Sequence, residues 1–215
     1  MQEIVLCQSS PEIMYLRQKD KRLSKIISSI GDLSYTVPEG DGYSFVIHEI
    51  IEQMLSSKAG QVIYNRLESL CNGDVSPESI SQLTDDEIKG IGTSRPKLRC
   101  IREFTEYTKQ GLLDKERFLS LSDSEVQKSL TSVRGIGNWT AKMYLIFVLN
   151  RPNILPFEDR AFLQVFSWLY KTSDSSPDIV QRKCRKWAPY SSIASRYFYR
   201  ALDTGMTNQE FHLFK

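Results

Sequence analysis

Hydrophobic residues recur at helical spacing along most of this chain. The stripe of isoleucines and leucines in residues 11–30 predicts a helix, and Gly31 follows it as a stop signal. Residues 43–56 are more strongly apolar, which is typical of a helix buried on most sides. Between these two segments, residues 33–42 carry one proline and two glycines, and we interpret them as a linker.

Capping signals and the same periodicity predict helices along the rest of the chain. Pro77 suits a first helical position, and the pairs Thr84–Glu87 and Ser122–Glu125 have the spacing of a capping box. Alternating runs of strand length are scarce, so the predicted fold class is all-α. In addition to the helices that start at these signals, we expect helices over residues 58–71, 96–110, 138–148, 159–170, 178–187 and 190–204.

Composition adds limits rather than a function. Of the 215 residues, 40% are hydrophobic and 25% are charged, so the chain can bury a core. The longest apolar run, residues 143–149, is far too short to span a membrane, and the N-terminal residues do not resemble a signal peptide. The four cysteines lie far apart in sequence, which argues against a compact zinc or iron–sulfur loop and favours a reduced, cytosolic protein.

Charge is distributed unevenly along the chain. The net charge is only +2, but residues 134–200 hold eleven basic and four acidic side chains, a local excess of +7 that leaves −5 for the rest. Segregated charge of this kind can create a basic face on a nearly neutral protein. Because basic clusters are usually solvated helix faces, this asymmetry alone favours a nucleic-acid partner only slightly.

One segment is more specific: residues 130–143 read LTSVRGIGNWTAKM. A helix ends in Gly-Ile-Gly and a second helix begins at once. Gly135 and Gly137 permit a tight turn and close approach of a ligand, and Ile136 can fill the joint between the helices. The amides at the start of the second helix favour an anion such as a phosphate. The full string resembles the helix-hairpin-helix motif of DNA-binding proteins more than an ordinary helical corner with a C-cap glycine.

The residues after the hairpin make the resemblance family-specific. Residues 155–160 read LPFEDR, so Pro-x-x-Asp follows Gly-Ile-Gly-x-Trp-Thr-Ala by about twenty residues. This arrangement resembles the DNA-3-methyladenine glycosylase II family of the helix-hairpin-helix DNA glycosylase superfamily. The apolar helix and Gln-containing segment over residues 43–59 and the string WAPYSS at residues 187–192 extend the similarity, which covers about residues 12–204.

The resemblance implies a two-lobed, all-α fold. Residues 43–150 would form a central lobe that carries the hairpin at 130–148, and residues 1–42 and 151–215 would form the second lobe. The family activity implied is a glycosylase that flips an alkylated purine of the 3-methyladenine type out of duplex DNA and hydrolyses its N-glycosidic bond in base-excision repair. We expect no cofactor and no catalytic metal, although a monovalent cation at the hairpin is consistent with the family. We expect a monomer that binds damaged duplex DNA and no membrane, in a bacterial nucleoid or a eukaryotic nucleus.

The resemblance also implies a catalytic residue. Asp159 matches the family carboxylate that stabilises positive charge on the sugar and orients the attacking water. It is equally placed to cap the following helix, and both roles can hold together. The neighbouring Glu158 is a lesser candidate. Trp139 stands where superfamily members that cleave the DNA backbone have a Schiff-base lysine, which implies a monofunctional enzyme with water as nucleophile.

The remaining candidates divide into DNA contacts and pocket residues, and core packing is a competing explanation for the apolar and aromatic ones. Gln53 would lie near the DNA-facing loop, with Met54 or Leu55 as the wedge that fills the gap left by the flipped base. Two alternative functions stay open: a glycosylase for a deaminated or oxidised base, and a non-catalytic DNA-binding protein. The expected DNA contacts of the hairpin are Gly135, Ile136, Gly137, Asn138, Thr140 and Lys142, with Arg95 and Lys97 as further phosphate contacts. The aromatic candidates for the base pocket are Trp139, Tyr144, Tyr190, Tyr197 and Tyr199, and His48 is expected to be a core histidine.

Overall fold

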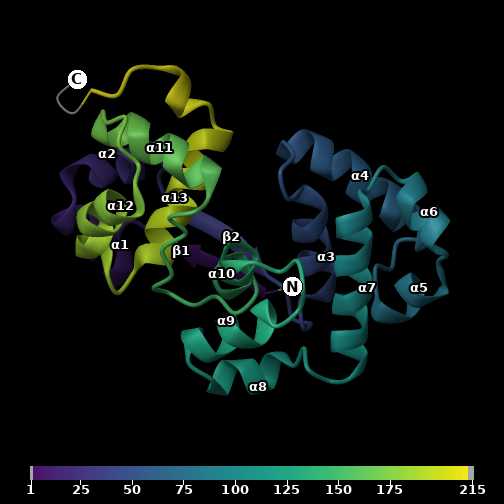
Figure 1. Cartoon of the computed structure of the whole chain (residues 1–215). Coiled ribbons are helices and arrows are strands. Elements are labelled where there is room, and N and C mark those ends of the chain that lie inside the picture. Colours follow the sequence, from purple (N-terminus) through teal and green to yellow (C-terminus); the bar gives the residue numbers. More distant parts are fainter. Residues whose placement is uncertain (1, 213–215) are drawn as a thin grey trace. The chain divides into compact units, whose positions relative to one another are not determined.

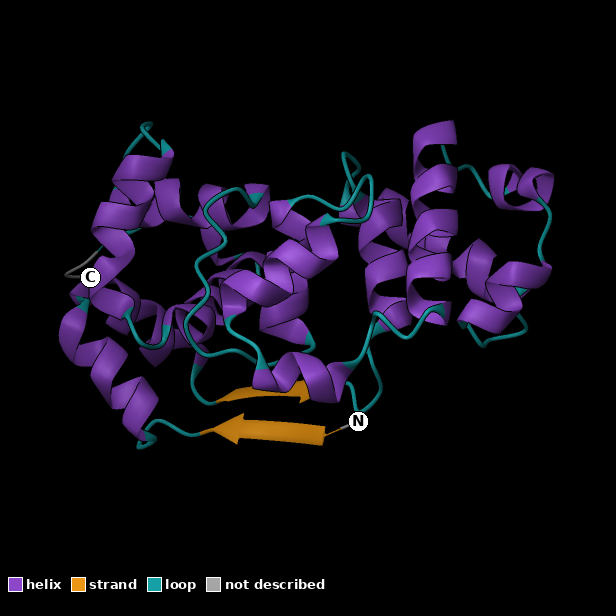
Figure 2. Cartoon of the chain, turned by 60° about the horizontal axis from the view of Figure 1, so that its bottom comes forward, coloured by secondary structure: helices purple, strands orange, loops and turns teal. Residues whose placement is uncertain are grey.

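The computed structural model describes residues 2–212, which form helices for the most part (Figures 1 and 2). The prediction of an all-α protein is therefore confirmed, with one small sheet in addition. The chain forms two compact units: unit 1 takes the chain up to Val37 and again from Asn150, and unit 2 spans Pro38–Leu149. No helix among the described residues has the length and apolar character needed to cross a bilayer.

Unit 1 is built around an aromatic core. Phe162, Trp187 and Phe198 are fully buried and pack against one another with ring centroids 5.0–6.2 Å apart. Such mutual contacts between aromatic rings add to the free energy gained by burying their area. The helices of this unit are α1 (Pro11–Lys19), α2 (Lys21–Ile30), α11 (Arg160–Tyr170), α12 (Pro177–Cys184), η1 (Arg185–Trp187), α13 (Ser191–Asp203) and η2 (Met206–Asn208), and its strands are β1 (Gln2–Leu6) and β2 (Leu33–Val37).

The interpretation of residues 33–42 as a linker is wrong for their first half. Strand β2 pairs antiparallel with β1, with Ile4 opposite Tyr35, and Figure 2 shows the two strands side by side. The residues of β2 alternate between buried and exposed, so that Leu33 and Val37 face the core. The proline and glycines that suggested a linker come after this strand, and five residues are too few for the alternation to stand out in the sequence.

The predicted helix over residues 11–30 is interrupted at Asp20. The side chain of Asp20 caps α2 by accepting from two backbone amides. It also accepts from Trp187 Nε1 at 2.9 Å and from the Tyr170 hydroxyl, and it pairs with Lys186 Nζ at 3.0 Å. Burial alone would raise the pKa of Asp20, but these hydrogen bonds and the positive charge of Lys186 outweigh it and hold the pKa below its ordinary value.

Unit 2 contains the hairpin and the helices that support it. Both predicted capping boxes are present, at Thr84–Glu87 and Ser122–Glu125. One short helix, α8 (Lys115–Ser120), is not predicted from the sequence, and Asp114 caps it by accepting from the amide of Arg117. Helix α7 packs against α3 and α5 (Figure 1). The helices of this unit are α3 (Tyr43–Glu52), α4 (Ser57–Leu70), α5 (Pro77–Gln82), α6 (Asp85–Gly90), α7 (Arg95–Lys109), α8 (Lys115–Ser120), α9 (Asp123–Thr131) and α10 (Asn138–Phe147).

Candidate functional site

Gly135 and Gly137 occupy their positions in the hairpin for different structural reasons. Gly135 has φ +96°, and a Cβ there would come within 2.8 Å of the Cys100 sulfur, so both the backbone and the packing require glycine. Ile136 is buried between α9 and α10, as expected for a plug. Gly137 has an extended backbone that any residue can adopt, and a Cβ there would meet nothing within 4 Å. The open space beside Gly137 therefore leaves the start of α10 accessible to a ligand.

Gln53 holds the hairpin from the end of α3. Its Nε2 donates to the carbonyl oxygen of Gly135 at 3.0 Å and to the hydroxyl of Thr140 at 3.3 Å. Thr140 is buried in the first turn of α10. We predicted both residues as DNA contacts, but the structure directs these groups to each other. Gln53 is a brace that fixes the turn, and Thr140 is its anchor on α10.

The loop after Gln53 presents an apolar tip. Met54 has φ +62°, a conformation that is costly for a residue with a Cβ, and 92% of its surface is exposed. Leu55 follows with 42% of its surface exposed. The brace on one side and the start of α4 on the other hold these two side chains out in solvent. Backbone strain at an exposed methionine points to a functional reason for the conformation.

Lys97 stabilises the end of α3, just before the same loop. We expected it to contact phosphate, but its Nζ donates to the carbonyl oxygen of Ile51 at 2.6 Å, in the last turn of α3. A cation there also complements the negative end of the helix dipole. Partial burial lowers the pKa of Lys97. Lys97 therefore helps to position the end of α3, from which Gln53 extends.

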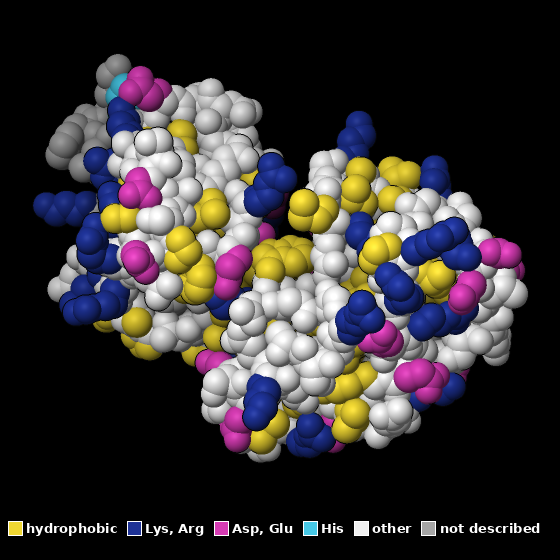
Figure 3. Space-filling view, viewed as in Figure 1, with side chains coloured by type: hydrophobic (Ala, Val, Ile, Leu, Met, Phe, Trp, Pro, Cys, Tyr) yellow, Lys and Arg dark blue, Asp and Glu magenta, His cyan; other side chains and the backbone are white. Residues whose placement is uncertain are grey.

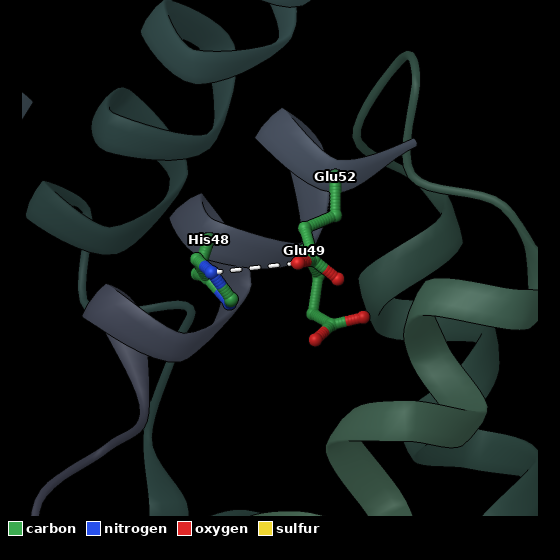
Figure 4. Close-up of side chains that lie close together, drawn as sticks. All are labelled: His48, Glu49 and Glu52. Carbon is green, nitrogen blue, oxygen red and sulfur yellow. Dashed lines mark ion pairs between the residues drawn. The ribbon is translucent and has the colours of Figure 1, made fainter. Parts of the chain in front are cut away.

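The described residues offer one group that could hold a metal ion: His48, Glu49 and Glu52 of α3, whose ligand atoms lie within 4.8 Å of one another (Figure 4). His48 Nε2 lies 3.8 Å from Glu52 Oε1, and its ring meets Tyr64 edge to face at 4.6 Å. The carboxylate of Glu49 points away from the His48 ring and has an interaction of its own. His48 is thus half-buried between α3 and α4 rather than deep in the core.

In unit 1, Asp159 is the last residue of the Pro-x-x-Asp motif. The amide of Asp159 donates to the carbonyl oxygen of Pro156 at 3.0 Å, so the four-residue motif is a closed turn. The Asp159 carboxylate caps α11 by accepting from the amide of Phe162 at 2.7 Å. Asp159 is 8% exposed, whereas Glu158 is exposed. The predicted capping role of Asp159 is confirmed.

The aromatic candidates separate into core and partly exposed residues. Tyr144 is fully buried, donates its hydroxyl to the carbonyl oxygen of Asp41 at 2.6 Å and packs edge to face on Phe118. Burial raises its pKa. The expectation that it lines a base pocket is therefore wrong, because it belongs to the core of unit 2. Tyr197 is likewise buried, and its hydroxyl donates to the carbonyl oxygen of Gly31 at 3.1 Å.

The other candidates keep accessible surface to different degrees. Tyr190 is half-buried and meets Tyr15 edge to face at 5.4 Å. Trp139 and Tyr199 are also half-buried. On α10, Asn138 is exposed, whereas Lys142 is largely buried, unlike a solvated phosphate contact.

Comparisons with known proteins show the family of this chain. The family model described as "HhH-GPD superfamily base excision DNA repair protein" matches residues 47–190, which include the hairpin and Asp159. DNA-3-methyladenine glycosylase 1 of Schizosaccharomyces pombe is 28% identical over 205 residues, which are 93% of this chain and 90% of that protein.

Solved structures match over nearly the whole chain. The DNA-3-methyladenine glycosidase of Bacillus halodurans superposes with a TM-score of 0.81 at 28% identity, over 98% of this chain and 97% of that one. The S. pombe 3-methyladenine DNA glycosylase Mag1, solved in complex with abasic DNA, gives a TM-score of 0.77 at 26% identity, over 88% and 95% of the two chains.

Proposed function

We propose, since this chain belongs to the HhH-GPD superfamily of base excision DNA repair proteins, that it is an alkylbase DNA glycosylase. The observation that carries the proposal is the similarity to 3-methyladenine glycosylases over almost the full chain, one of them solved with abasic DNA. The substrate is duplex DNA with an alkylated purine of the 3-methyladenine type, and the protein acts as a monomer in base-excision repair. Such an enzyme works where the DNA is, in a nucleoid or a nucleus.

The hairpin binds the DNA backbone without reading sequence. The first amides of α10 have no acceptor within the helix and lie next to the open space beside Gly137, which suits a phosphate oxygen. The carbonyl oxygens of the hairpin turn would hold a monovalent cation, which would supply positive charge for the phosphate. The carbonyl of Gly135 accepts from Gln53 and keeps a second lone pair, so such an ion fits.

The loop after Gln53 supplies the wedge. Moving the damaged nucleotide out of the stack costs a few kcal/mol of free energy and leaves a gap in the duplex. An apolar side chain has to fill that gap. Met54 and Leu55 are the candidates, and the exposure and the backbone strain of Met54 favour it. Gln53 links this loop to the hairpin, so that the wedge and the phosphate site are held in one frame.

Asp159 assists the chemistry. The N-glycosidic bond breaks with its electron pair going to the alkylated base, which leaves as a neutral molecule, while positive charge develops on the sugar. The Asp159 carboxylate stabilises that charge, and a water molecule adds to the sugar carbon and loses a proton. No cofactor is needed. Because Trp139 stands in place of a Schiff-base lysine, the enzyme is monofunctional and leaves an abasic site.

The test is release of free base from alkylated duplex DNA by the protein and by Asp159→Asn. Asparagine keeps an oxygen that accepts from the Phe162 amide, so α11 stays capped while the charge is lost. We expect the single-turnover rate of base release to fall by about 10²- to 10³-fold. DNA binding and the melting temperature should change little.

The matched control is Glu158→Gln, which removes an exposed charge one residue away. It should release base at nearly the parent rate. If the parent protein binds alkylated DNA and releases nothing, the substrate assignment fails. Release from duplexes with a deaminated or oxidised base would then point to another lesion, and no release at all would point to a DNA-binding protein without catalysis.

A further inference from the structure

The two units differ in net charge. Unit 1 holds 15 basic and 10 acidic residues, a net of +5, whereas unit 2 holds 13 basic and 16 acidic residues, a net of −3. The unit with the phosphate-binding hairpin is therefore the acidic one. Proteins that bind polyanions generally carry a basic surface. The hairpin of unit 2 does not account for the positive charge of unit 1, which therefore calls for a separate explanation.

Much of the positive charge of unit 1 lies on one surface, which we call the basic ridge. Contacts between its two halves show that they are neighbours: Lys186 Nζ lies 3.0 Å from Asp20 Oδ2, and Lys183 and Lys186 lie 5.0 and 5.5 Å from the ring centre of Tyr170, which itself donates to Asp20. Figure 3 shows a column of Lys and Arg side chains along the edge of unit 1 where Figure 1 places α2, α1 and α12. We define the basic ridge as the exposed or half-exposed Lys and Arg residues of segments 19–21 and 182–186, which are Lys19, Lys21, Arg182, Lys183, Arg185 and Lys186.

The two segments that carry the ridge hold few acidic residues of their own, although Figure 3 shows acidic side chains beside the column of Lys and Arg. Asp20 is the only acidic residue between positions 13 and 25, and its side chain is 1% exposed beneath the ridge. No acidic residue lies between positions 179 and 202. The nearest acids along the chain, Asp174 and Asp178, come before this stretch. Hydrogen bonds from Ser176 are the main reason that the pKa of Asp174 is lowered, with smaller contributions from Arg182 and Lys183.

The ridge has the character of a polyanion site rather than of a protein interface. Of the large hydrophobic side chains exposed in the described part of the chain, only Met14 lies on a helix that carries the ridge, α1. Protein interfaces usually rely on a cluster of buried aromatic or aliphatic anchors, and one methionine does not form such a cluster. Lys19, Lys183 and Lys186 lie over aromatic rings, as Lys19 does over Tyr15 at 5.4 Å, which limits the freedom that these side chains lose on binding.

We propose that the basic ridge is a second DNA-binding surface, which contacts phosphates of undamaged duplex independently of the hairpin. The inference rests on the proposed function, which brings long duplex DNA to this protein. Each cation that neutralises a phosphate releases condensed counterions, so the ridge adds sequence-independent, salt-sensitive affinity. This affinity keeps the protein on DNA while the acidic unit 2 engages a phosphate only through the local geometry of its hairpin.

The experiment measures binding to undamaged duplex DNA as a function of salt concentration. The test variant combines Lys19→Gln, Arg182→Gln and Arg185→Gln, three exposed residues of the ridge. Lys186 is left intact because it pairs with the buried Asp20. The slope of log K against log salt should become shallower by about 2 to 3, because each lost phosphate contact contributes about 0.9.

The matched control removes the same charge from unit 2 through Lys89→Gln, Lys109→Gln and Arg117→Gln, which are also exposed. Its slope should stay close to that of the parent. An equal change in both triple variants would mean that only net charge matters, and no change in the ridge variant would mean that the ridge serves another acidic partner. Either result overturns the proposal.

Glycosylase activity provides an independent readout. At saturating enzyme, the ridge variant should release base from alkylated duplex at the parent rate, because the ridge lies outside the catalytic machinery. A parent protein that releases no base would contradict the proposed function, yet the salt slopes on undamaged DNA would still decide the role of the ridge. A ridge variant that binds DNA normally and loses base release would contradict the ridge proposal alone.

Discussion

The two units offer two different solutions to the problem of binding a polyanion. Unit 2 has a net charge of −3, and the phosphate site proposed for it depends on backbone geometry, in which Gly135 and the Gln53 brace set the turn. Unit 1 has a net charge of +5 and presents cationic side chains over a single buried carboxylate. Backbone amides bind a phosphate at one fixed place, whereas side-chain charge binds many phosphates loosely. Position and affinity can therefore be supplied by different parts of one chain.

The units also use buried charge in opposite ways. In unit 1, Asp20 is buried with partners that lower its pKa. In unit 2, the opposite holds for Glu52: burial raises its pKa, and the nearby His48 lowers it by less. The first carboxylate stabilises the fold when it is ionised, and the second costs free energy when it is ionised.

The largest effect on stability is expected for Asp20→Ala. The substitution removes the cap of α2 and leaves Trp187 Nε1 and the Tyr170 hydroxyl without their acceptor, which should cost about 3–5 kcal/mol. Thermal unfolding followed by circular dichroism measures the loss. Asp178→Ala, at an exposed position in the first turn of α12, is the control and should change stability little. A small effect of Asp20→Ala would contradict the role of Asp20 as the central acceptor of unit 1.

The same contrast predicts how the units respond to acid. The folded pKa of Asp20 is below its unfolded value, so its contribution is complete above the unfolded pKa and is lost as the pH falls through the folded pKa. The folded pKa of Glu52 is above its unfolded value, so its contribution to stability is present at low pH and is lost as the pH rises. Amide hydrogen exchange between pH 7 and pH 3 should show protection falling around Asp20 before it falls around α3.

Within unit 2, the two hairpin glycines should separate folding from binding. Gly135→Ala forces a Cβ against Cys100 at a positive φ and should destabilise the protein by about 2–4 kcal/mol. Gly137→Ala has an ordinary backbone and free space, so the protein should melt as the parent does. The new methyl group would occupy the space beside the first amides of α10, and DNA affinity should fall. Normal affinity of Gly137→Ala would place the phosphate elsewhere.

The sequence predicted what depends on local signals. Capping boxes, the Gly-Ile-Gly turn and Pro-x-x-Asp each involve a few neighbouring residues, and the structure contains them at the predicted positions. It did not predict what depends on partners distant in the chain. Cys100 requires Gly135 to be glycine, and Lys97 caps α3 through Ile51, but no spacing in the sequence links either pair.

The same limit explains the wrong assignments. The sequence predicts Tyr144 as a pocket residue because its helix is expected to border the base-binding cleft, yet Asp41 and Phe118 are near it only in the fold. The strand β2 was missed because five residues carry little periodicity. The basic ridge was visible only as an excess of charge, since its two halves are about 160 residues apart in the sequence.

Gln53 links the hairpin to the loop that carries Met54 and Leu55. Gln53→Ala removes two hydrogen bonds to the hairpin and should cost about 1–2 kcal/mol of stability. DNA affinity should fall because the hairpin turn loses its brace. Since no charge changes, the slope of log K against log salt should stay the same, unlike in the ridge variant. Gln61→Ala is the control, because its amide bonds only to Asn65 on the surface of α4. Unchanged affinity of Gln53→Ala would mean that the hairpin holds its shape without the brace.

The smallest change in stability is expected at Met54, where two substitutions separate strain from function. Met54→Ala and Met54→Gly both remove the exposed apolar tip, but only glycine is relaxed at φ +62°, so Met54→Gly should be more stable than Met54→Ala by about 1 kcal/mol. Both should release base more slowly than the parent, since neither can fill the gap left by the flipped base. Leu55→Ala is the control. If it slows base release and both Met54 variants do not, Leu55 is the wedge, and the strain at Met54 serves to place its neighbour.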